Sequence, residues 1–494
     1  MKTRVLLDPM TRIEGHLRIE AVVEDGTVVE ARSSATLYRG FEQMLEGREP
    51  TDAVQLTQRF CGVCPTAHAV ASSQCLDNAL GIMPPDNGRI IRNLIQGANY
   101  IQSHILHFYH LTVLDFVRGP EIPPFVPRYE ADYRLPKTTS DAMIDHYVQA
   151  LHVRLKAHEM SAVFSGKMPH CASVVPGGVT MIPEVDKITT FLWRLKELRD
   201  FIDNVYLPDV MTIAEVYRDY VEIGTGCRCV LSYGAFDLDS EPQVTKRKRF
   251  FKMARVRDGK IESVDPGRIT EDVRSSWYRS PSGLHPREGS TIPDPKKATG
   301  YSWIKAPRYE GSVYEVGPMA RAVIGLAADA ESPHAKLLRS SLDHLRLSPE
   351  SLFSVLGRHL ARAIETKAMA DAMASWVLEI QLDKPVATPF EMPKEATGYG
   401  LWDASRGALG HWIAIRDKKI DRYQAVVPTT WNASPRDDAG RPGPIEQALV
   451  GTEVKDPSNP FSLARIVRSF DPCIACAVHV VTPSGRLLQK LKVV

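Results

Sequence analysis

Two short stretches decide how this chain folds: RFCGVCPTAH at residues 59–68 and DPCIACAVH at residues 471–479. Each contains a C-x-x-C, the spacing that lets two thiolates from one turn bind the same metal ion. One pair lies near the beginning of the 494-residue chain and the other near its end. A metal bound by both pairs would therefore connect the two ends of the protein in one core. The four cysteines are Cys61, Cys64, Cys473 and Cys476.

The donor set limits the choice of metal. Four thiolates select zinc, nickel, copper(I) or iron over magnesium or calcium. A structural zinc ribbon usually keeps its two cysteine pairs about 15–20 residues apart, because the metal organises a small local module. The long separation here disfavours a zinc ribbon. Disulfides are disfavoured too, because we recognise no signal peptide and no small secreted scaffold.

Six further blocks accompany the cysteine motifs, in order along almost the whole chain. They are RIEGHL (12–17), YRGFE (38–42), HFYHLTVLDF (107–116), GKMPH (166–170), RGALGH (406–411) and VVPTTWNASPRD (426–437). Together with the cysteine motifs, this ordered set resembles the large, catalytic subunit of nickel–iron hydrogenases. The alternatives are a hydrogen-sensing relative, and a structural zinc protein with four cysteine ligands, from a different class. The quinone-binding subunit of respiratory complex I, which shares the fold, lacks the cysteine pairs.

The resemblance implies an uptake-type hydrogenase that splits H2 reversibly and heterolytically into protons and electrons. It implies nickel bound by all four cysteines. It also implies that the second cysteine of each pair, Cys64 and Cys476, binds an iron that carries CO and cyanide. A terminal thiolate can accept the proton from heterolysis, and the resemblance gives this role to Cys473.

Four other kinds of site residue follow from the resemblance. Glu14, in RIEGHL, would be the next proton acceptor after Cys473, a role that requires a buried carboxylate close to the sulfur. Arg406 would project its guanidinium over the metals and polarise hydrogen, with Asp115 and Asp471 as the carboxylates that make a buried cation tolerable. His68 would donate a hydrogen bond to a bridging sulfur.

One block departs from the family pattern. The family commonly has Glu-Ala-Pro-Arg-Gly where this chain has Asp403-Ala404-Ser405-Arg406. Because proline restricts the backbone, we expect its loss to loosen the loop that places the arginine.

The resemblance also implies a second metal site and a gas channel. Glu42, His479 and a backbone carbonyl near Ala425 would bind a divalent ion, usually magnesium, through oxygen and imidazole ligands. Val63 and Leu114 would line the inner end of the channel, and their moderate size favours a catalytic enzyme over a hydrogen sensor. Simple core packing explains Leu114 equally well.

The tail at 480–494 is expected to be removed after His479. In this family, a nickel-dependent endopeptidase cuts there once nickel-insertion factors have loaded the metals. The alternative is that the apolar residues of the tail form an edge strand.

The partners follow from the cysteine count. The remaining cysteines are Cys75, Cys171, Cys227 and Cys229, and they offer no C-x-x-C for iron–sulfur clusters. By resemblance, electrons would pass to an iron–sulfur small subunit in a heterodimer and, through that partner, to a membrane cytochrome. The location would be cytoplasmic, or periplasmic or membrane-associated by co-export with the small subunit, because the chain shows no signal of its own.

Composition is that of a large globular subunit. The chain is 44% hydrophobic and 24% charged with a net charge of +2, which offers no field for nucleic acid. No apolar run is long enough to span a bilayer.

Hydrophobic periodicity is mostly helical, so we expect a mainly α fold with small β elements. Long helices would form a bundle core, flanked by irregular peripheral lobes. Within a single catalytic subunit, 1–494, we expect a β-hairpin region at 1–36 with its turn at Asp25-Gly26. We expect the first long helices at 87–223, an irregular lobe at 240–299 and a further core helix at 348–380. Individual helices are predicted at 87–117, 140–164, 184–203 and 348–379, the second and fourth with N-caps at Ser140 and Ser348.

Overall fold

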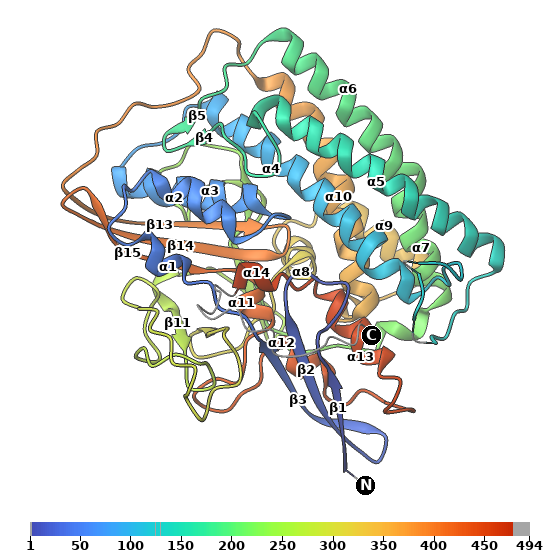
Figure 1. Cartoon of the computed structure of the whole chain (residues 1–494). Helices are drawn as coiled ribbons and strands as arrows, with labels where there is room; N and C mark the ends of the chain where they lie inside the picture. The colour runs from blue at the N-terminus through green and yellow to red at the C-terminus, as the bar shows by residue number, and fades with distance from the viewer. Residues whose placement is uncertain (1, 124, 129, 478–494) are drawn as a thin grey trace.

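A bundle of long helices forms one side of the protein (Figure 1). The computed structural model describes residues 2–123, 125–128 and 130–477. Helix α10 (Val355–Trp376) is the centre of the bundle, because it packs against α4 (Asp86–Leu106), α6 (Val185–Phe201) and three shorter helices. Helix α5 (Lys137–Ser165) lies between α4 and α6. The shorter helices are α7 (Leu207–Val216), α8 (Pro318–Ala328) and α9 (Pro333–Leu345).

Three helix boundaries differ from the predicted ones. The apolar stripe that predicted one helix to Val117 continues past α4 as a π-helix, His107–Thr112, and a 3-10 turn, Val113–Asp115. Helix α5 begins before Ser140, directly after Pro136. Ser348 precedes only a 3-10 turn, and Ser354 caps α10 by accepting from the Gly357 amide. Capping residues alone could not locate these starts, because Pro136 provides no side-chain cap for α5 and both Ser348 and Ser354 precede α10.

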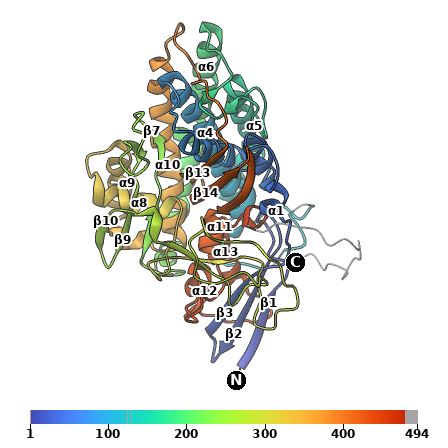
Figure 2. The same ribbon diagram turned by 90° about the vertical axis from the view of Figure 1, so that its left-hand side faces the viewer.

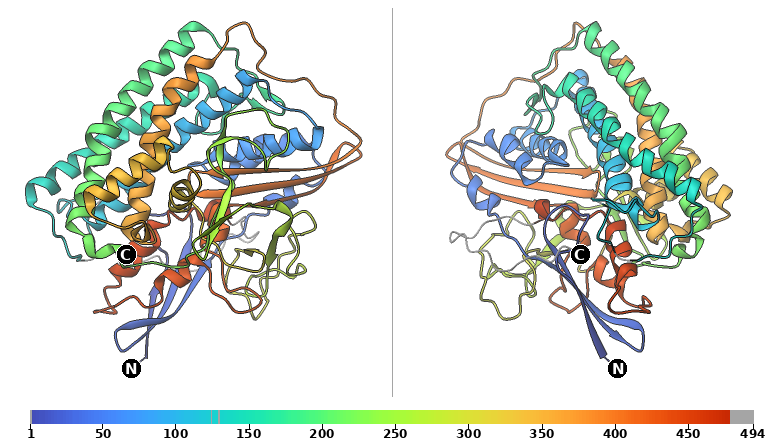
Figure 3. Two further views of the ribbon diagram at one scale, coloured as in Figure 1. Left: turned by 180° about the vertical axis from the view of Figure 1, so that it is seen from behind. Right: turned by 45° about the vertical axis from the view of Figure 1, so that its right-hand side comes forward.

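A three-stranded antiparallel sheet crosses the middle of the molecule beside the bundle (Figure 3). Its strands are β13 (Glu395–Ala404), β14 (Gly407–Arg416) and β15 (Lys419–Val426). Helix α3 (Pro65–Leu80) packs on β13 and β14. A side chain at Gly398 or Gly400 would collide with the α3 backbone at Cys75 O or Ala71 O, so these glycines allow the helix to lie directly on the sheet. Helix α3 begins at the first cysteine motif, which this contact therefore fixes.

The N-terminal segment forms a second antiparallel sheet at the end of the molecule opposite α6 (Figure 2). Strands β2 (Leu17–Glu24) and β3 (Thr27–Ala35) are joined by the turn at Asp25-Gly26, and β1 (Lys2–Leu7) adds a third strand to the predicted hairpin. Between β1 and β2, Glu14 forms an isolated parallel bridge with Cys473. The amide of Ile474 donates to Glu14 O at 2.8 Å. The two ends of the chain thus meet at the second cysteine motif.

The remaining elements are short. Residues 240–299 are largely irregular and wind beside the sheets, visible in yellow-green in Figure 1. No helix within the described ranges combines the length and apolar character needed to cross a membrane. The short helices are α1 (Phe41–Leu45), α2 (Asp52–Thr57), α11 (Pro428–Asn432), α12 (Pro444–Leu449), α13 (Phe461–Ser469) and α14 (Ile474–Ala477). The short strands are β4 (Val174–Val175), β5 (Gly178–Val179), β6 (Val230–Ser232), β7 (Ala235–Asp237), β8 (Arg249–Phe251), β9 (Ala254–Arg257), β10 (Lys260–Glu262), β11 (Ile269–Asp272) and β12 (Ala306–Tyr309).

Candidate metal centre

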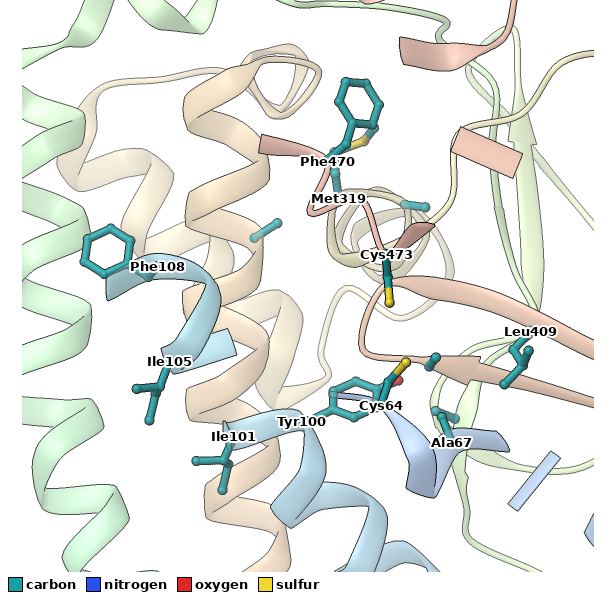
Figure 4. Close-up of a cluster of buried hydrophobic side chains, with 14 of the residues drawn as sticks. Cys64, Ala67, Tyr100, Ile101, Ile105, Phe108, Met319, Leu409, Phe470 and Cys473 are labelled. Carbon is teal, nitrogen blue, oxygen red and sulfur yellow. The ribbon is translucent and has the colours of Figure 1, made fainter. Parts of the chain in front are cut away.

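The four predicted cysteines converge on one buried point. Their sulfur atoms all lie within 4.8 Å of one another, and no other group of three or more candidate ligands occurs in the described part of the chain. Cys61 follows a 3-10 turn, Cys64 caps α3, and Cys473 and Cys476 lie before and within α14. In the close-up, Cys64 and Cys473 direct their sulfurs towards each other (Figure 4).

The sulfur spacing is informative about the metal. The Sγ atoms of Cys61 and Cys473 are 3.2 Å apart, those of Cys64 and Cys476 3.2 Å, and those of Cys473 and Cys476 3.1 Å. Regular tetrahedral zinc, with Zn–S bonds of about 2.3 Å, would separate its sulfurs by about 3.8 Å. All three separations are shorter than those of a regular tetrahedral zinc site.

Charge on the sulfurs is unevenly shared. Hydrogen bonds from Cys473, Cys476 and Cys64 hold the pKa of Cys61 well below its usual range. Burial raises the pKa of both Cys473 and Cys476. One thiolate is thus favoured, stabilised further by the guanidinium of Arg406. Because metal ligation requires deprotonated thiols, binding a metal here would release protons from the other cysteines.

Glu14 lies against this cluster. Its Oε2 accepts from the Cys473 thiol at 3.2 Å and from the Ala475 amide at 2.9 Å. Burial, together with the negative charge of Cys61, raises the pKa of the Glu14 carboxyl. The carboxylate is therefore close enough to exchange a proton with the sulfur and is shifted towards its neutral form.

Gly15 permits this approach. Its φ is +85°, and a Cβ there would meet Ala475 N at 2.8 Å and the Ile474 Cβ at 2.9 Å. We expect Gly15→Ala to reduce the free energy of unfolding by about 2–4 kcal/mol, because it adds both backbone strain and a collision with α14. It should also lower nickel retention, measured by elemental analysis after dialysis against a chelator.

Gly26→Ala is the matched control. Gly26 has a similar φ of +81° but has nothing within 4 Å of its Cβ position. This variant should lose only about 1 kcal/mol of unfolding free energy and keep its metal. Equal nickel retention in the two variants would show that the contact at Gly15 does not close the site.

Arg406 lies in the two-residue turn between β13 and β14. Its Nη2 pairs with Asp471 Oδ1 at 2.9 Å, its Nε donates to Asp471 O at 3.0 Å, and its Nη1 donates to Ser103 Oγ at 3.3 Å. Burial opposes the charged form, but the negative charge of Asp471, helped by that of the Cys61 thiolate, raises the Arg406 pKa well above its usual value, so the side chain stays charged. The expected loosening of this loop stays a prediction, but Asp403, Ser405 and Arg406 are all buried and hydrogen-bonded, so contacts other than a proline hold the loop.

Asp115 does not contact Arg406, contrary to expectation. It forms ion pairs with Arg12 and with Arg468 at 2.7 Å, and its backbone carbonyl accepts from Arg465 at 2.9 Å. The positive charges of Arg12, Arg468 and Arg465 outweigh the effect of burial and lower the Asp115 pKa. The carboxylate therefore balances this group of arginines, which come from RIEGHL and α13.

His68 is buried beside the cluster, but its described partner is another ring. Its Nδ1 lies 3.2 Å from His411 Nε2, and His411 Nδ1 lies 2.6 Å from the Tyr423 hydroxyl. Burial lowers the pKa of His68 to about 4, so the ring is neutral near pH 7. The hydrogen bond from His68 to a bridging sulfur stays a prediction.

The two expected channel residues are partly buried at the edge of the core, which also suits simple packing. The carbonyl of Val63 accepts from Asn99 at 3.0 Å and from Gln102 at 2.6 Å, which holds the first cysteine loop against α4. Leu114 lies in the 3-10 turn that ends with Asp115.

Glu42 and Ala425 are adjacent in the structure. The Ala425 amide donates to Glu42 Oε1 at 3.0 Å, and the Thr291 hydroxyl contacts Glu42 Oε2. The third expected ligand, His479, and the tail at 480–494 lie outside the described residues.

The other cysteines take no part in a metal cluster among the described residues. Cys75 and Cys171 are buried and donate to Gly398 O and Gln58 Oε1, whereas Cys227 and Cys229 are partly exposed. Sequence reasoning missed Arg12, Arg468 and Thr429, whose hydroxyl accepts from the Cys473 amide at 3.0 Å. Arg12 and Thr429 lie inside the quoted blocks, so a signal was available for both, whereas nothing in the sequence singled out Arg468.

Comparison with known proteins agrees with this site. The family model "nickel-dependent hydrogenase" matches residues 39–122 and 118–479. The chain is 44% identical to the periplasmic [NiFeSe] hydrogenase large subunit of Desulfomicrobium baculatum, over 97% of this chain and 95% of that protein. It is 34% identical to the uptake hydrogenase large subunit of Rhizobium leguminosarum bv. viciae, over 99% and 97%.

The fold is also shared. The structure of the Ni-Fe-Se hydrogenase from D. vulgaris Hildenborough superposes with a TM-score of 0.92 at 46% identity, covering 97% of this chain and 100% of that chain. These matches confirm the family and the fold that the ordered sequence blocks indicated.

Proposed function

This chain belongs to the nickel-dependent hydrogenase family, and we propose that it is the large subunit of an uptake enzyme that splits H2 heterolytically. The observation that carries this proposal is the arrangement of a carboxylate, a guanidinium and four sulfurs at one buried point. Glu14 Oε2 lies 3.2 Å from Cys473 Sγ. The sulfurs of the other three cysteines lie within 4.8 Å of Cys473 Sγ.

The metals proposed for the four cysteines are one nickel and one iron, the iron bound by Cys64 and Cys476. When bound, they would supply the redox change and the open position at which hydrogen reacts. Selenium appears in the names of several relatives, but all four ligand positions here are cysteine. We therefore propose an all-sulfur ligand set.

The chain's own residues would handle the proton. Cys473, which hydrogen-bonds to Glu14 at 3.2 Å, is the proposed first acceptor, and the raised pKa of Glu14 suits this carboxyl to take the proton next. Arg406 remains charged and would hold its guanidinium beside the sulfurs. The proposed path leads from the Cys473 sulfur to the Glu14 carboxylate.

Buried positive charge supports CO and cyanide on the iron. Arg12, Arg465 and Arg468 surround Asp115, while Arg362 and Arg406 both interact with Asp471. Arg465 also pairs with Asp132, so these five guanidinium groups face three carboxylates. Cyanide ligands would make the metal centre anionic and would balance this excess. Infrared spectroscopy should show their stretching bands.

We propose a magnesium ion, or another divalent ion, between Glu42, the Ala425 carbonyl and His479. Glu42 is 5% exposed and forms no salt bridge among the described residues, and Lys305, whose charge acts with it, pairs with Glu271 instead. A buried carboxylate of this kind is costly unless a cation neutralises it, and a hard divalent ion prefers oxygen ligands.

An iron–sulfur small subunit is the proposed partner. The four remaining cysteines are scattered, so electrons from the site would need clusters on another chain. That partner would link the enzyme to a membrane cytochrome. A periplasmic location reached by co-export with the small subunit is proposed, because one relative is named as periplasmic.

The tail at 480–494 should be absent from the mature enzyme. We propose that nickel-insertion factors load the site and that a nickel-dependent endopeptidase then cuts after His479, which frees this residue to reach Glu42. Intact-mass analysis of nickel-loaded protein should show a chain that ends at His479. An active, nickel-containing chain that still ends at Val494 would overturn this proposal.

The activity itself is tested with the chain co-expressed with its cluster-bearing partner. The purified complex should reduce a viologen dye under H2, and the rate should rise in proportion to its nickel content. Protein grown without nickel is the control and should be inactive. Dye reduction that is independent of nickel, or none in fully loaded protein, would refute the function.

A further inference from the structure

A second buried arginine, Arg321 of α8, holds the turn that carries Arg406. Its Nε and Nη2 donate to the two carboxylate oxygens of Glu365 in α10 at 2.8 and 2.7 Å. Its Nη1 pairs with Asp403 Oδ2 at 2.9 Å and donates to Ala404 O at 3.1 Å, and Nη2 also donates to Ser405 O at 2.8 Å. A guanidinium has five N–H donors, so every one is used.

These contacts fix the peptide groups that lead into Arg406. The carbonyls of Ala404 and Ser405 precede Arg406 directly in the chain, so Arg321 fixes their orientation. On the other side, Gly407 has a φ of 122°, and a Cβ there would meet Gly317 N at 2.5 Å. The turn is therefore pressed against the segment that leads into α8.

Helix α4 holds the turn from a third direction. Ser103 Oγ accepts from Arg406 Nη1 at 3.3 Å and from the Ser405 hydroxyl at 3.2 Å. The next residue, His104, places its Nε2 2.7 Å from Glu365 Oε1. Figure 4 shows this part of α4, with Tyr100 labelled. Helices α4 and α8 thus contact the turn directly, and Glu365 of α10 contacts both Arg321 and His104.

We propose that Arg321, together with Ser103, is a positioning residue that sets the place of the Arg406 guanidinium beside the sulfurs, in the role that a proline in the turn would otherwise fill. The inference rests on the proposed role of Arg406. Ser405 and Arg406 both have negative φ, which fits a type I turn, and proline is favoured at the first central position of that turn. Here the buried hydrogen bonds restrict the turn instead.

The test compares Arg321→Lys with and without Ser405→Pro in the complete heterodimer. A lysine cannot reproduce five hydrogen bonds, so the rate of H2 oxidation per bound nickel should fall about 10- to 100-fold through misplacement of Arg406. Adding Ser405→Pro should recover most of that rate, whereas the melting temperature should stay low. Ser405→Pro alone should stay within about twofold of the wild-type rate, because proline fits this position.

Arg308→Lys is the matched control. Arg308 is equally buried, pairs with Asp437 at 2.8 Å and donates to Ser434 Oγ and backbone carbonyls, away from the turn. It should lower the melting temperature but keep the rate per nickel. An Arg321→Lys rate per nickel equal to that of Arg308→Lys, or no recovery with Ser405→Pro, would overturn the inference.

Two further variants keep the outcome decisive. If Arg321→Lys binds no nickel, Ser103→Ala takes its place in the test. Ser103→Ala should lower the rate per nickel several-fold, and adding Ser405→Pro should restore that rate. An unchanged rate in Ser103→Ala would overturn the inference. Arg406→Lys separates the proposed role of Arg406 from the proposed positioning role of Arg321 and Ser103. If it is inactive while Arg321→Lys and Ser103→Ala are fully active, only the positioning role fails; if it is fully active, the proposed role of Arg406 fails.

Discussion

Replacing Cys473 by serine should abolish H2 oxidation. The Cys473 sulfur lies 3.2 Å from Cys61, 3.1 Å from Cys476 and 3.2 Å from Glu14, so the change removes a metal ligand and the proposed proton acceptor together. A serine hydroxyl is a hard, weakly acidic group and a poor ligand for a soft metal site. The measurement is dye reduction under H2, with nickel content determined on the same sample.

Cys229→Ser is the matched control for the loss of a thiol. Cys229 is partly exposed and lies outside the sulfur cluster. This variant should keep wild-type metal content and activity. Full activity in Cys473→Ser would refute the assignment of this cysteine to the reaction.

Glu14→Gln should lower turnover about 10²- to 10⁴-fold while leaving the metals in place, because an amide cannot relay a proton. The glutamine can still accept from the Ala475 amide, so the fold should tolerate it. Conversion between para- and ortho-hydrogen at the metals should suffer less than exchange between H2 and solvent deuterons. The two assays separate a defect in the relay from a defect in the site.

The pH dependence gives a second check on Glu14. Because burial raises the pKa of Glu14, its carboxyl should lose its proton at a higher pH than an ordinary carboxyl does. The wild-type rate should therefore change with pH in that higher range. Glutamine does not titrate, so this limb of the profile should vanish. Glu20→Gln, in β2 at a surface ion pair with Arg4, is the control and should behave as wild type. Wild-type exchange with solvent deuterons in Glu14→Gln would exclude the relay.

Much of the site could be predicted because its ligands come in short, dense motifs. A C-x-x-C places its two sulfurs by local geometry alone, and the order of the surrounding blocks indicated the family. The hairpin at Asp25-Gly26 and the long helices also follow from local periodicity and turn chemistry. These features depend on residues close together in the sequence.

The errors concern contacts between distant segments. Asp115 was matched to Arg406, but Arg12 and Arg468, which are far from it in the sequence, are its partners. The five hydrogen bonds of Arg321, which hold the turn that lacks the proline, likewise cannot be inferred from the turn sequence. Charge pairing in a core depends on which elements pack together, and periodicity does not specify that.

Metal analysis of the purified heterodimer tests the central claim most directly. The large subunit should contain about one nickel and one iron at the four cysteines, apart from the clusters of its partner. Cys61→Ser and Cys476→Ser should each lose nickel, whereas Cys171→Ser should not. The predicted result is that nickel and iron are present in the wild type and are lost when a cysteine of the cluster is replaced. Zinc as the only metal bound at the four cysteines would contradict the account.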